Sequence, residues 1–122
     1  MTDQETPSPR VLLLCSDLFF STQLKGAAQA AGAAVEVELR LAHALEHASS
    51  GDYRLLVVDL EFPGLDIAAL VAGLPAENRP TVIAFGPHVQ VARLKAARDA
   101  GCDEVVPRSI AAETVAKLVG SE

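Results

Sequence analysis

The acidic residue Asp59 has the sequence position that best suits a functional site. It ends a short unbroken apolar run, 55–58, and Pro63-Gly64 forces a turn soon after it. A short, bounded apolar run is typical of a strand that is buried on both faces. Because open α/β sheets bind ligands at the carboxyl ends of their strands, we expect the Asp59 carboxylate to point into such a crevice. Asp59 is therefore the first candidate site residue.

A second candidate, His88, follows another apolar run, 81–85, after the interruption Gly86-Pro87. This loop would lie at the same end of the sheet, where His88 could approach Asp59 and neutralise it. The alternative is a turn in which Gly86 permits close approach of the chain and His88 caps the next helix. We favour the turn.

A third pattern, His-x-x-Glu-His, is formed by His43, Glu46 and His47 and occurs in one class of zinc hydrolases. Two histidines four residues apart share a helix face. A catalytic zinc needs three protein ligands, however, and the remaining histidine, His88, is expected on a distant loop. We expect a solvated helix face here, with a zinc hydrolase as a remote alternative.

Other common chemistries find no support in the sequence. It contains neither Gly-x-Gly-x-x-Gly nor Gly-Lys-Ser/Thr, the patterns that hold nucleotide phosphates. Ser16 and Ser109 have no visible histidine relay that would make either one a nucleophile. We therefore expect that the chain is not an enzyme.

Size and composition indicate one domain with a core of Ala, Val and Leu. The chain has 122 residues, half of them apolar and 4% aromatic, and this length suffices to fold without a disulfide or a metal. The net charge of −6, without a basic cluster, argues against nucleic-acid binding. No apolar run approaches the ~20 residues of a membrane helix, and no secretory signal pattern opens the chain. We expect a cytoplasmic protein that does not bind membranes, with Cys15 and Cys102 as small unpaired residues.

Apolar periodicity predicts five strands that alternate with five helices in a single domain, 10–122, after a disordered N-terminal tail, 1–9. The strands are expected at 10–15, 34–39, 54–60, 81–85 and 104–106, and the helices at 18–31, 41–48, 66–72 or 66–74, 89–100 and 111–119. Such alternation predicts a parallel sheet with helices on both faces. The strict apolar-polar alternation of 34–39 marks an edge strand.

Two helices carry local signals. Ser16 or Asp17 can cap the helix that begins near residue 18. Val91, Leu94 and Ala97 share one face of the helix expected at 89–100, and we expect that face to enter the core.

The chain resembles the receiver domain of bacterial response regulators over residues 10–120. The matching features are the (βα)5 order, an acid followed by Pro-Gly within 58–64, and Ala-Gly-Cys-Asp-Glu at 100–104. The resemblance implies a flavodoxin-like (βα)5 three-layer sandwich, with a parallel five-stranded sheet of order 2-1-3-4-5. It also places Asp59 at the position that is phosphorylated in receivers.

The receiver's metal ligands are altered here. A phosphoryl group brings negative charge beside a carboxylate, and a divalent cation held by further carboxylates must offset it. The family's acidic pair at the end of strand one is Cys15-Ser16 in this chain, and Asp17 follows one residue late. We expect no metal or other cofactor. The alternative is a phosphoaccepting receiver of a two-component phosphorelay, in which Asp17 and Asp59 serve as weak Mg²⁺ ligands.

The phosphoryl-binding positions also differ from the family. Gly86 replaces a Ser or Thr, and Arg108-Ser109 replaces a Lys-Pro. Arg108 keeps a positive charge and could pair with Asp59, since a lone acid in a crevice costs free energy. The resemblance with these departures implies a degenerate pocket in a pseudo-receiver, which signals by protein–protein contact without aspartyl phosphorylation.

In the family, helix four, strand five and helix five commonly form the surface that mediates pairing and partner binding. Here that surface maps to 89–100, 104–106 and 111–119, and its charged side chains are Arg93, Lys95, Arg98, Glu113 and Lys117. The resemblance implies a protein partner or a second copy of this chain in a two-fold dimer. An ordinary solvated helix face is the alternative.

Overall fold

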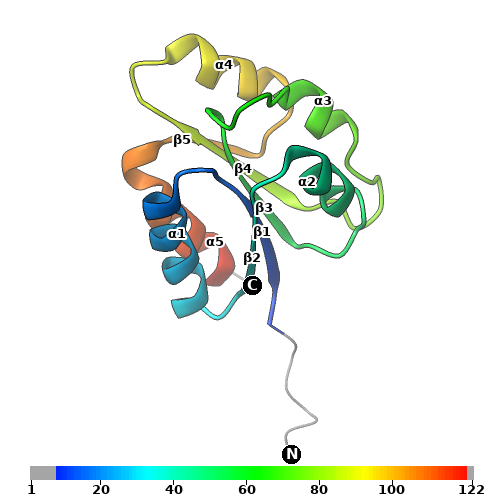
Figure 1. Cartoon of the computed structure of the whole chain (residues 1–122), viewed down its shortest axis with the longest axis vertical. Helices are drawn as coiled ribbons and strands as arrows, with labels where there is room; N and C mark the ends of the chain where they lie inside the picture. Colours follow the sequence, from blue (N-terminus) through cyan, green and yellow to red (C-terminus); the bar gives the residue numbers. More distant parts are fainter. Residues whose placement is uncertain (1–7, 121–122) are drawn as a thin grey trace, which may run out of the picture.

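Residues 8–120 form five strands that alternate with five α-helices in the computed structural model (Figure 1). The strands are β1 (Arg10–Leu14), β2 (Ala34–Glu38), β3 (Leu55–Asp59), β4 (Thr81–Gly86) and β5 (Glu104–Pro107). The helices are α1 (Leu18–Ala30), α2 (Leu41–Ala48), α3 (Ile67–Ala72), α4 (Val91–Asp99) and α5 (Ala111–Gly120), with the 3₁₀ helix η2 (Arg108–Ile110) directly before α5. All strand pairs are parallel and the sheet order is β2-β1-β3-β4-β5, which confirms the predicted fold class.

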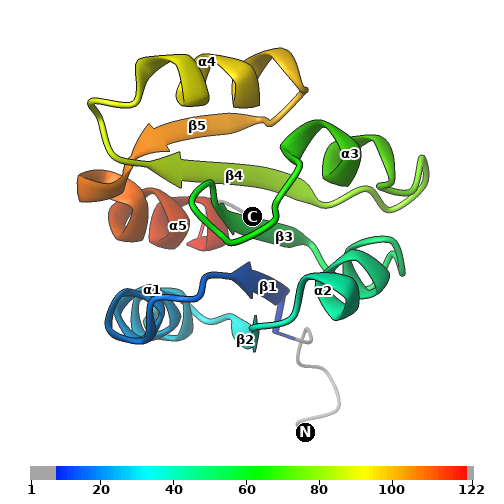
Figure 2. The same cartoon turned by 45° about the horizontal axis from the view of Figure 1, so that its top comes forward.

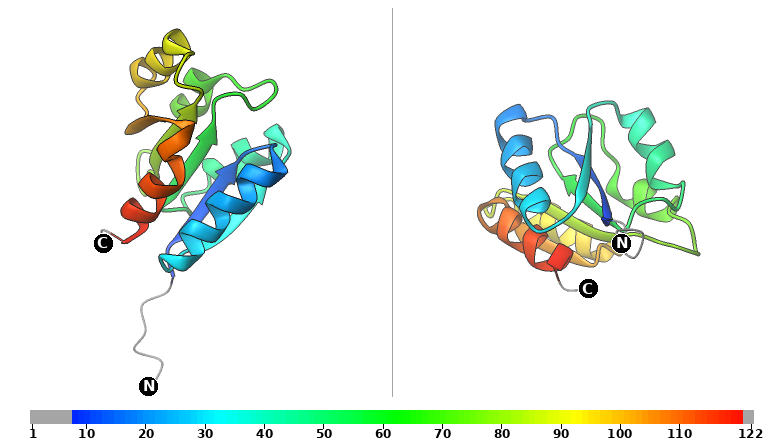
Figure 3. Two further views of the ribbon diagram at one scale, coloured as in Figure 1. Left: turned by 90° about the vertical axis from the view of Figure 1, so that its left-hand side faces the viewer. Right: turned by 90° about the horizontal axis from the view of Figure 1, so that it is seen from below.

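Helices cover both faces of the sheet, so the molecule has three layers (Figures 1 and 3). Alternate residues of a strand point to opposite faces. Leu13 therefore packs in the core beneath α1 and α5, while Leu12 packs beneath α2 and α3 on the other side. The smaller cluster under α4 contains Leu94 and Ala97. Strands β1, β3 and β4 are buried on both faces, and β2 lies at an edge as predicted.

The strand register brings the functional candidates to one end of the sheet. Asp59 pairs in register with Phe85, and Gly86 pairs with Pro107 one step further along. Figure 2 shows the arrowheads of β4 and β5 at the same end of the sheet. The loops that follow β1, β3, β4 and β5 therefore meet at one edge, as the parallel arrangement requires.

Helix α4 begins later than predicted, and one expected core residue is consequently outside. The amide of Gln90 donates to the carbonyl of Pro87 at 3.0 Å, so a turn occupies the positions assigned to the first helical residues. The helix then starts at Val91, whose side chain is 68% exposed. The prediction that Val91 enters the core is wrong, whereas Leu94 and Ala97 are buried as expected.

Both cysteines are free, as predicted. Cys15 is fully buried at the end of β1, and Cys102 is half-buried before β5, at the opposite end of the sheet. Burial raises the pKa of each thiol to about 11.

Two further expectations concern the chain as a whole. The predicted N-terminal tail falls largely outside the described residues and stays a prediction; the carbonyl of Pro9 accepts a hydrogen bond from the amide of Ala34 at 2.9 Å. Between residues 8 and 120, every helix is too short or too polar to cross a bilayer.

Candidate functional site

Asp59 is a buried carboxylate at the end of β3. Its side chain is only 3% exposed. The amide of Glu61 donates to Oδ1 at 2.9 Å, and the Cys15 thiol donates to Oδ2 across 3.7 Å. Burial raises the pKa of Asp59 above its usual value, and this effect outweighs the opposing influence of the Glu61 amide and of Arg108. Asp59 thus stands at the carboxyl end of β3, where the sequence placed it, and its carboxylate is buried rather than open to a crevice.

The Arg108 guanidinium lies in the middle of three carboxylates. Nη2 is 3.1 Å from Glu61 Oε1 and 3.7 Å from Asp59 Oδ2, and Nη1 is 3.7 Å from Asp17 Oδ2. The side chain reaches this position from η2, directly after β5. The ion pair between Arg108 and Asp59, expected from the sequence, therefore forms, and two further acids share the same cation.

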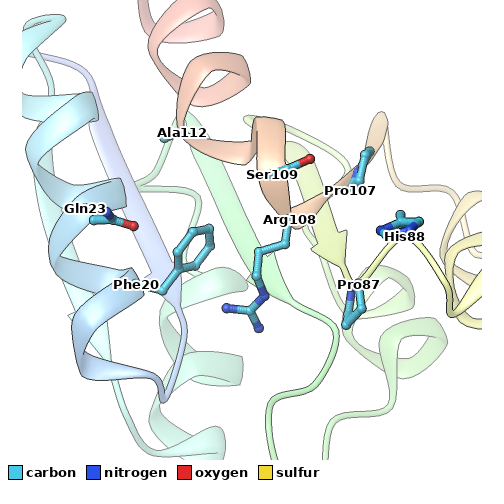
Figure 4. A pocket seen from close by; sticks show the side chains of 8 residues that line it. All are labelled: Phe20, Gln23, Pro87, His88, Pro107, Arg108, Ser109 and Ala112. Carbon is cyan, nitrogen blue, oxygen red and sulfur yellow. The ribbon is translucent and has the colours of Figure 1, made fainter.

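Two aromatic rings hold Arg108 in place. Its guanidinium carbon lies 4.7 Å from the centre of the Phe20 ring and 5.7 Å from that of Phe85. The two rings meet edge to face at 5.2 Å. Figure 4 shows the Arg108 side chain extending beside Phe20 on α1. A cation held over aromatic faces gains roughly 0.5–1 kcal/mol per ring at a partly exposed site. The guanidinium is thus fixed by packing as well as by charge.

Asp17 is the N-cap of α1. Its Oδ1 accepts a hydrogen bond from the amide of Phe20 at 3.0 Å, which leaves Oδ2 to face Arg108. The side chain is 49% exposed. The cap that the sequence offered to Ser16 or Asp17 is therefore Asp17, while Ser16 is exposed.

The donor set does not fit a hard divalent cation. Such ions need several oxygen ligands. Cys15 presents a protonated thiol that donates to Asp59, and Asp17 uses one oxygen to cap α1. Within residues 8–120, no group of three His, Cys, Asp or Glu side chains is arranged to hold a metal ion. Arg108 already supplies one positive charge among these carboxylates.

The remaining pocket positions do not converge on Asp59. Gly86 is buried, and a Cβ added to it would meet Leu60 and Leu94 at 3.7 Å, which is ordinary contact distance. The interpretation that Gly86 is needed for close approach is therefore wrong. Ser109 is exposed on η2, and in Figure 4 its hydroxyl points away from the Arg108 guanidinium.

His88 is an exposed residue on the wall of an open pocket. This pocket has a volume of about 690 Å³ and lies between α1, the β4–α4 loop and η2 (Figure 4). Arg108, not His88, forms the ion pairs described for Asp59. The N-cap of α4 is Gln90, so the interpretation of His88 as a helix cap is also wrong.

The His-x-x-Glu-His pattern lies on α2, on the sheet face opposite to α1 and α5 (Figure 1). His43 and Glu46 are exposed, and His47 Nδ1 is 3.7 Å from Glu38 Oε1. The exposure of His43 and Glu46 agrees with the solvated face expected from the sequence, whereas His47 is partly buried.

Three residues of the Arg108 environment were missed from the sequence: Glu61, Phe20 and Phe85. Glu61 had a detectable signal, because it is an acidic residue in the turn directly after the candidate Asp59. The aromatic contacts had none, since they join α1, β4 and η2 across long sequence separations.

The charged residues predicted for a partner surface are exposed. They lie on α4 and α5 and comprise Arg93, Lys95, Arg98, Glu113 and Lys117. Lys95 pairs within its own helix with Asp99 at 2.9 Å. An exposed pair of this kind contributes little to stability, and it occupies a charge that an interface would need.

Comparison with known proteins finds similarity in structure but none in sequence. No protein-family model matches the chain, and no curated protein sequence matches it. Solved structures do match. A response regulator from Burkholderia pseudomallei, solved with a phosphorylated aspartic acid, a calcium ion and citrate, has a TM-score of 0.74 at 18% identity, over 93% of this chain and 68% of that one.

Two further structures agree with it. The signal receiver domain from Bermanella marisrubri gives a TM-score of 0.76 at 19% identity, covering 92% of this chain and 98% of that one. The receiver domain of a Saccharomyces cerevisiae response regulator, crystallised with a histidine phosphotransfer signaling protein, gives 0.74 at 12% identity, covering 94% and 88%.

The chain therefore has the fold of response regulator receiver domains, which are signalling modules. At these identities the likeness defines the fold. The chemistry has to be argued from the residues themselves.

Proposed function

We propose that this chain is an atypical receiver that acts in cytoplasmic signal transduction through protein–protein contact, without phosphorylation of Asp59 and without enzymatic activity. The observation that carries the proposal is the Arg108 guanidinium, which lies within 3.7 Å of the carboxylates of Asp17, Asp59 and Glu61. A resident side chain thus supplies the charge that a bound cation would supply in phosphotransfer.

Electrostatics favours this reading. Aspartyl phosphorylation in the family needs Mg²⁺ beside the acceptor, and a metal entering this site would meet a guanidinium of the same sign. Displacing Arg108 would also break its contacts with Phe20 and Phe85. The thiol of Cys15, protonated at neutral pH because its pKa is about 11, offers a hydrogen rather than a lone pair toward Asp59.

A protein partner is the kind of partner we propose. The structurally similar yeast receiver was crystallised with a phosphotransfer protein. In this chain, two surfaces are available for such contact: the charged face of α4 and α5 with β5, and the loops around Arg108. The net charge of −6 weighs against nucleic acid as the target.

One observation favours a second candidate, a phosphoaccepting receiver. Asp17 and Asp59 both face the same guanidinium, so both could face one cation if Arg108 swung outward. In that case Asp17 and Asp59 would hold Mg²⁺, and Asp59 would accept the phosphoryl group.

Intact-mass analysis after incubation with Mg²⁺ and acetyl phosphate separates the two candidates. The wild-type chain is expected to gain no phosphoryl group. A matched variant that restores the family residues, Cys15→Asp/Ser16→Asp/Gly86→Thr/Arg108→Lys, is expected to gain one group, which Asp59→Asn abolishes. Phosphorylation of the wild-type chain on Asp59 would refute the proposal.

A further inference from the structure

The outer edge of β2 carries main-chain groups that no strand within residues 8–120 pairs with. β2 is the last strand of the sheet, beyond β1 (Figure 2). The amide of Ala34 donates to the carbonyl of Pro9 at 2.9 Å, so the main chain of Ala34 faces β1. Main-chain groups of successive residues in a strand point to alternate sides. The N–H and C=O groups of Val35 and Val37 therefore point outward, away from β1.

A hollow of about 250 Å³ lies between this edge and α1. Its walls are formed by Leu18, Ser21, Thr22, Lys25, Val37 and Leu39. Leu18 and Leu39 are 71% and 54% exposed. The hydroxyls of Ser21 and Thr22 both donate to the carbonyl of Leu18, at 3.1 and 2.8 Å, so these hydroxyls are satisfied within α1. We call the hollow, together with the outward main chain of Val35 and Val37, the β2 edge.

The unpaired charge beside the hollow is positive. Lys25 lines the hollow and Arg40 follows Leu39, and both side chains are exposed. Within residues 8–120, neither of these two cations forms an ion pair. Asp17, which precedes the first hollow residue of α1, faces Arg108 at 3.7 Å. An acidic side chain of a bound segment would therefore be attracted to Lys25 and Arg40.

The two glutamates of β2 lie on the opposite face of the sheet, beside α2, and both have partners there. Glu36 accepts hydrogen bonds from Arg10 Nη2 at 2.9 Å and from the Tyr53 hydroxyl. Glu38 Oε2 accepts from the next two main-chain amides at 3.1 Å, and its Oε1 lies 3.7 Å from His47 Nδ1. Unpaired charges on an edge strand hinder the addition of another strand. These carboxylates are held against their own chain, so the edge stays open to pairing.

We infer that the β2 edge binds an extended segment of another protein by strand addition, and that this segment carries apolar side chains and an acid on the face turned toward α1. Main-chain bonds to Val35 and Val37 supply affinity, and the hollow with Lys25 supplies selectivity. The inference rests on the proposed function as a protein-binding module and adds a third surface to the two named there. A second copy of this chain, paired about a two-fold axis with Val35 opposite Val37, would set Glu36 against Glu36, and like charges directly opposite destabilise a strand pair.

Selection from a displayed library of short random peptides, with the full chain as bait, supplies the probes for a test. Each selected peptide is synthesised in two forms that are N-methylated on one or the other set of alternate residues. Only every second residue of an added strand bonds to the edge, so one form should lose binding and the other should keep it. Hydrogen exchange of the Val35 and Val37 amides, followed by NMR, should slow when the unmethylated peptide binds.

Variants of the chain, with folding checked by far-UV circular dichroism, locate the contact. Lys25→Glu reverses the charge in the hollow, and Lys117→Glu on α5 is its matched control because both lysines are exposed. Leu39→Ser removes an apolar wall, and Leu45→Ser on α2 is its control, since Leu45 is also an exposed leucine.

The inference predicts peptides in which apolar residues alternate with other residues and an Asp or Glu shares the apolar face. Binding weakens at least tenfold in Lys25→Glu and severalfold in Leu39→Ser, and neither control changes it. Peptides that bind both variants as tightly as the wild-type chain, or that bind equally well in both methylated forms, overturn the inference. If Lys117→Glu abolishes their binding, the protein-binding function stands and the contact moves to α5. An empty selection, or a wild-type dimer in which the Val35 and Val37 amides are already protected, also overturns the inference, whereas the proposed function itself fails on phosphorylation of Asp59.

Discussion

Removing Arg108 tests whether this side chain holds the buried acid of the site. Arg108→Ala leaves Asp59 buried without its cation, and it also removes the contacts with Phe20 and Phe85. Breaking a fully buried ion pair costs about 3–5 kcal/mol, which is an upper bound here. The Nη2–Oδ2 distance is 3.7 Å and the Arg108 side chain is 29% exposed, so solvent weakens the pair. We expect about 1 kcal/mol from the pair and about 1 kcal/mol from the aromatic contacts.

The coupling to Asp59 is isolated by a double-mutant cycle. Arg108→Ala should lower the free energy of unfolding by about 2 kcal/mol in the wild-type chain and by about 1 kcal/mol in an Asp59→Asn background. Arg98→Ala, an exposed arginine on α4, should change it by less than about 0.5 kcal/mol. Urea unfolding followed by far-UV circular dichroism suits a chain without tryptophan. Equal losses in the two backgrounds would refute the role of Arg108 as the counter-ion of Asp59.

Three further predictions concern the same end of the sheet. Because burial raises the folded pKa of Asp59, the stability that its protonated form contributes is lost as pH rises from about 4 through that pKa. The free energy of unfolding of Asp59→Asn relative to wild type should therefore rise over this window, as measured by urea titrations at several pH values. A difference that does not change with pH would contradict this prediction. Gly86→Ala should raise the free energy of unfolding by about 0.5–1 kcal/mol, since its Cβ meets only ordinary contacts, and a loss above about 1 kcal/mol would contradict the packing. In Cys102→Ala, the Cys15 thiol should react slowly with a disulfide reagent at neutral pH and rapidly in urea; fast reaction in the folded chain would disprove its burial.

Much of the architecture is readable from the sequence because local patterns decide it. The buried runs of β1, β3 and β4 and the alternation of β2 were sufficient for the strand types and for the edge position. The apolar pattern alone did not predict the start of α4, where a turn competes with helix propensity. The bond from Gln90 to Pro87 delays α4 and turns Val91 outward, although its spacing to Leu94 fits a helix face.

The site was predictable in part. Asp59, Arg108 and their pairing follow from the position of an acid and a cation at the ends of parallel strands. The full environment does not, because Asp17, Phe20 and Phe85 reach Arg108 through tertiary packing of α1 and β4. The role of Gly86 was also misjudged, since the space around a backbone position is invisible in the sequence.

The most direct test of the central claim, that Arg108 takes the place of the cation, is an amide NMR titration of the wild-type chain with Mg²⁺ and beryllofluoride, a mimic of the phosphoryl group. The account predicts no saturable shifts at millimolar Mg²⁺. Joint, saturating shifts of the amides around Asp59, Gly86 and Arg108 would contradict it and would show a working phosphoacceptor site.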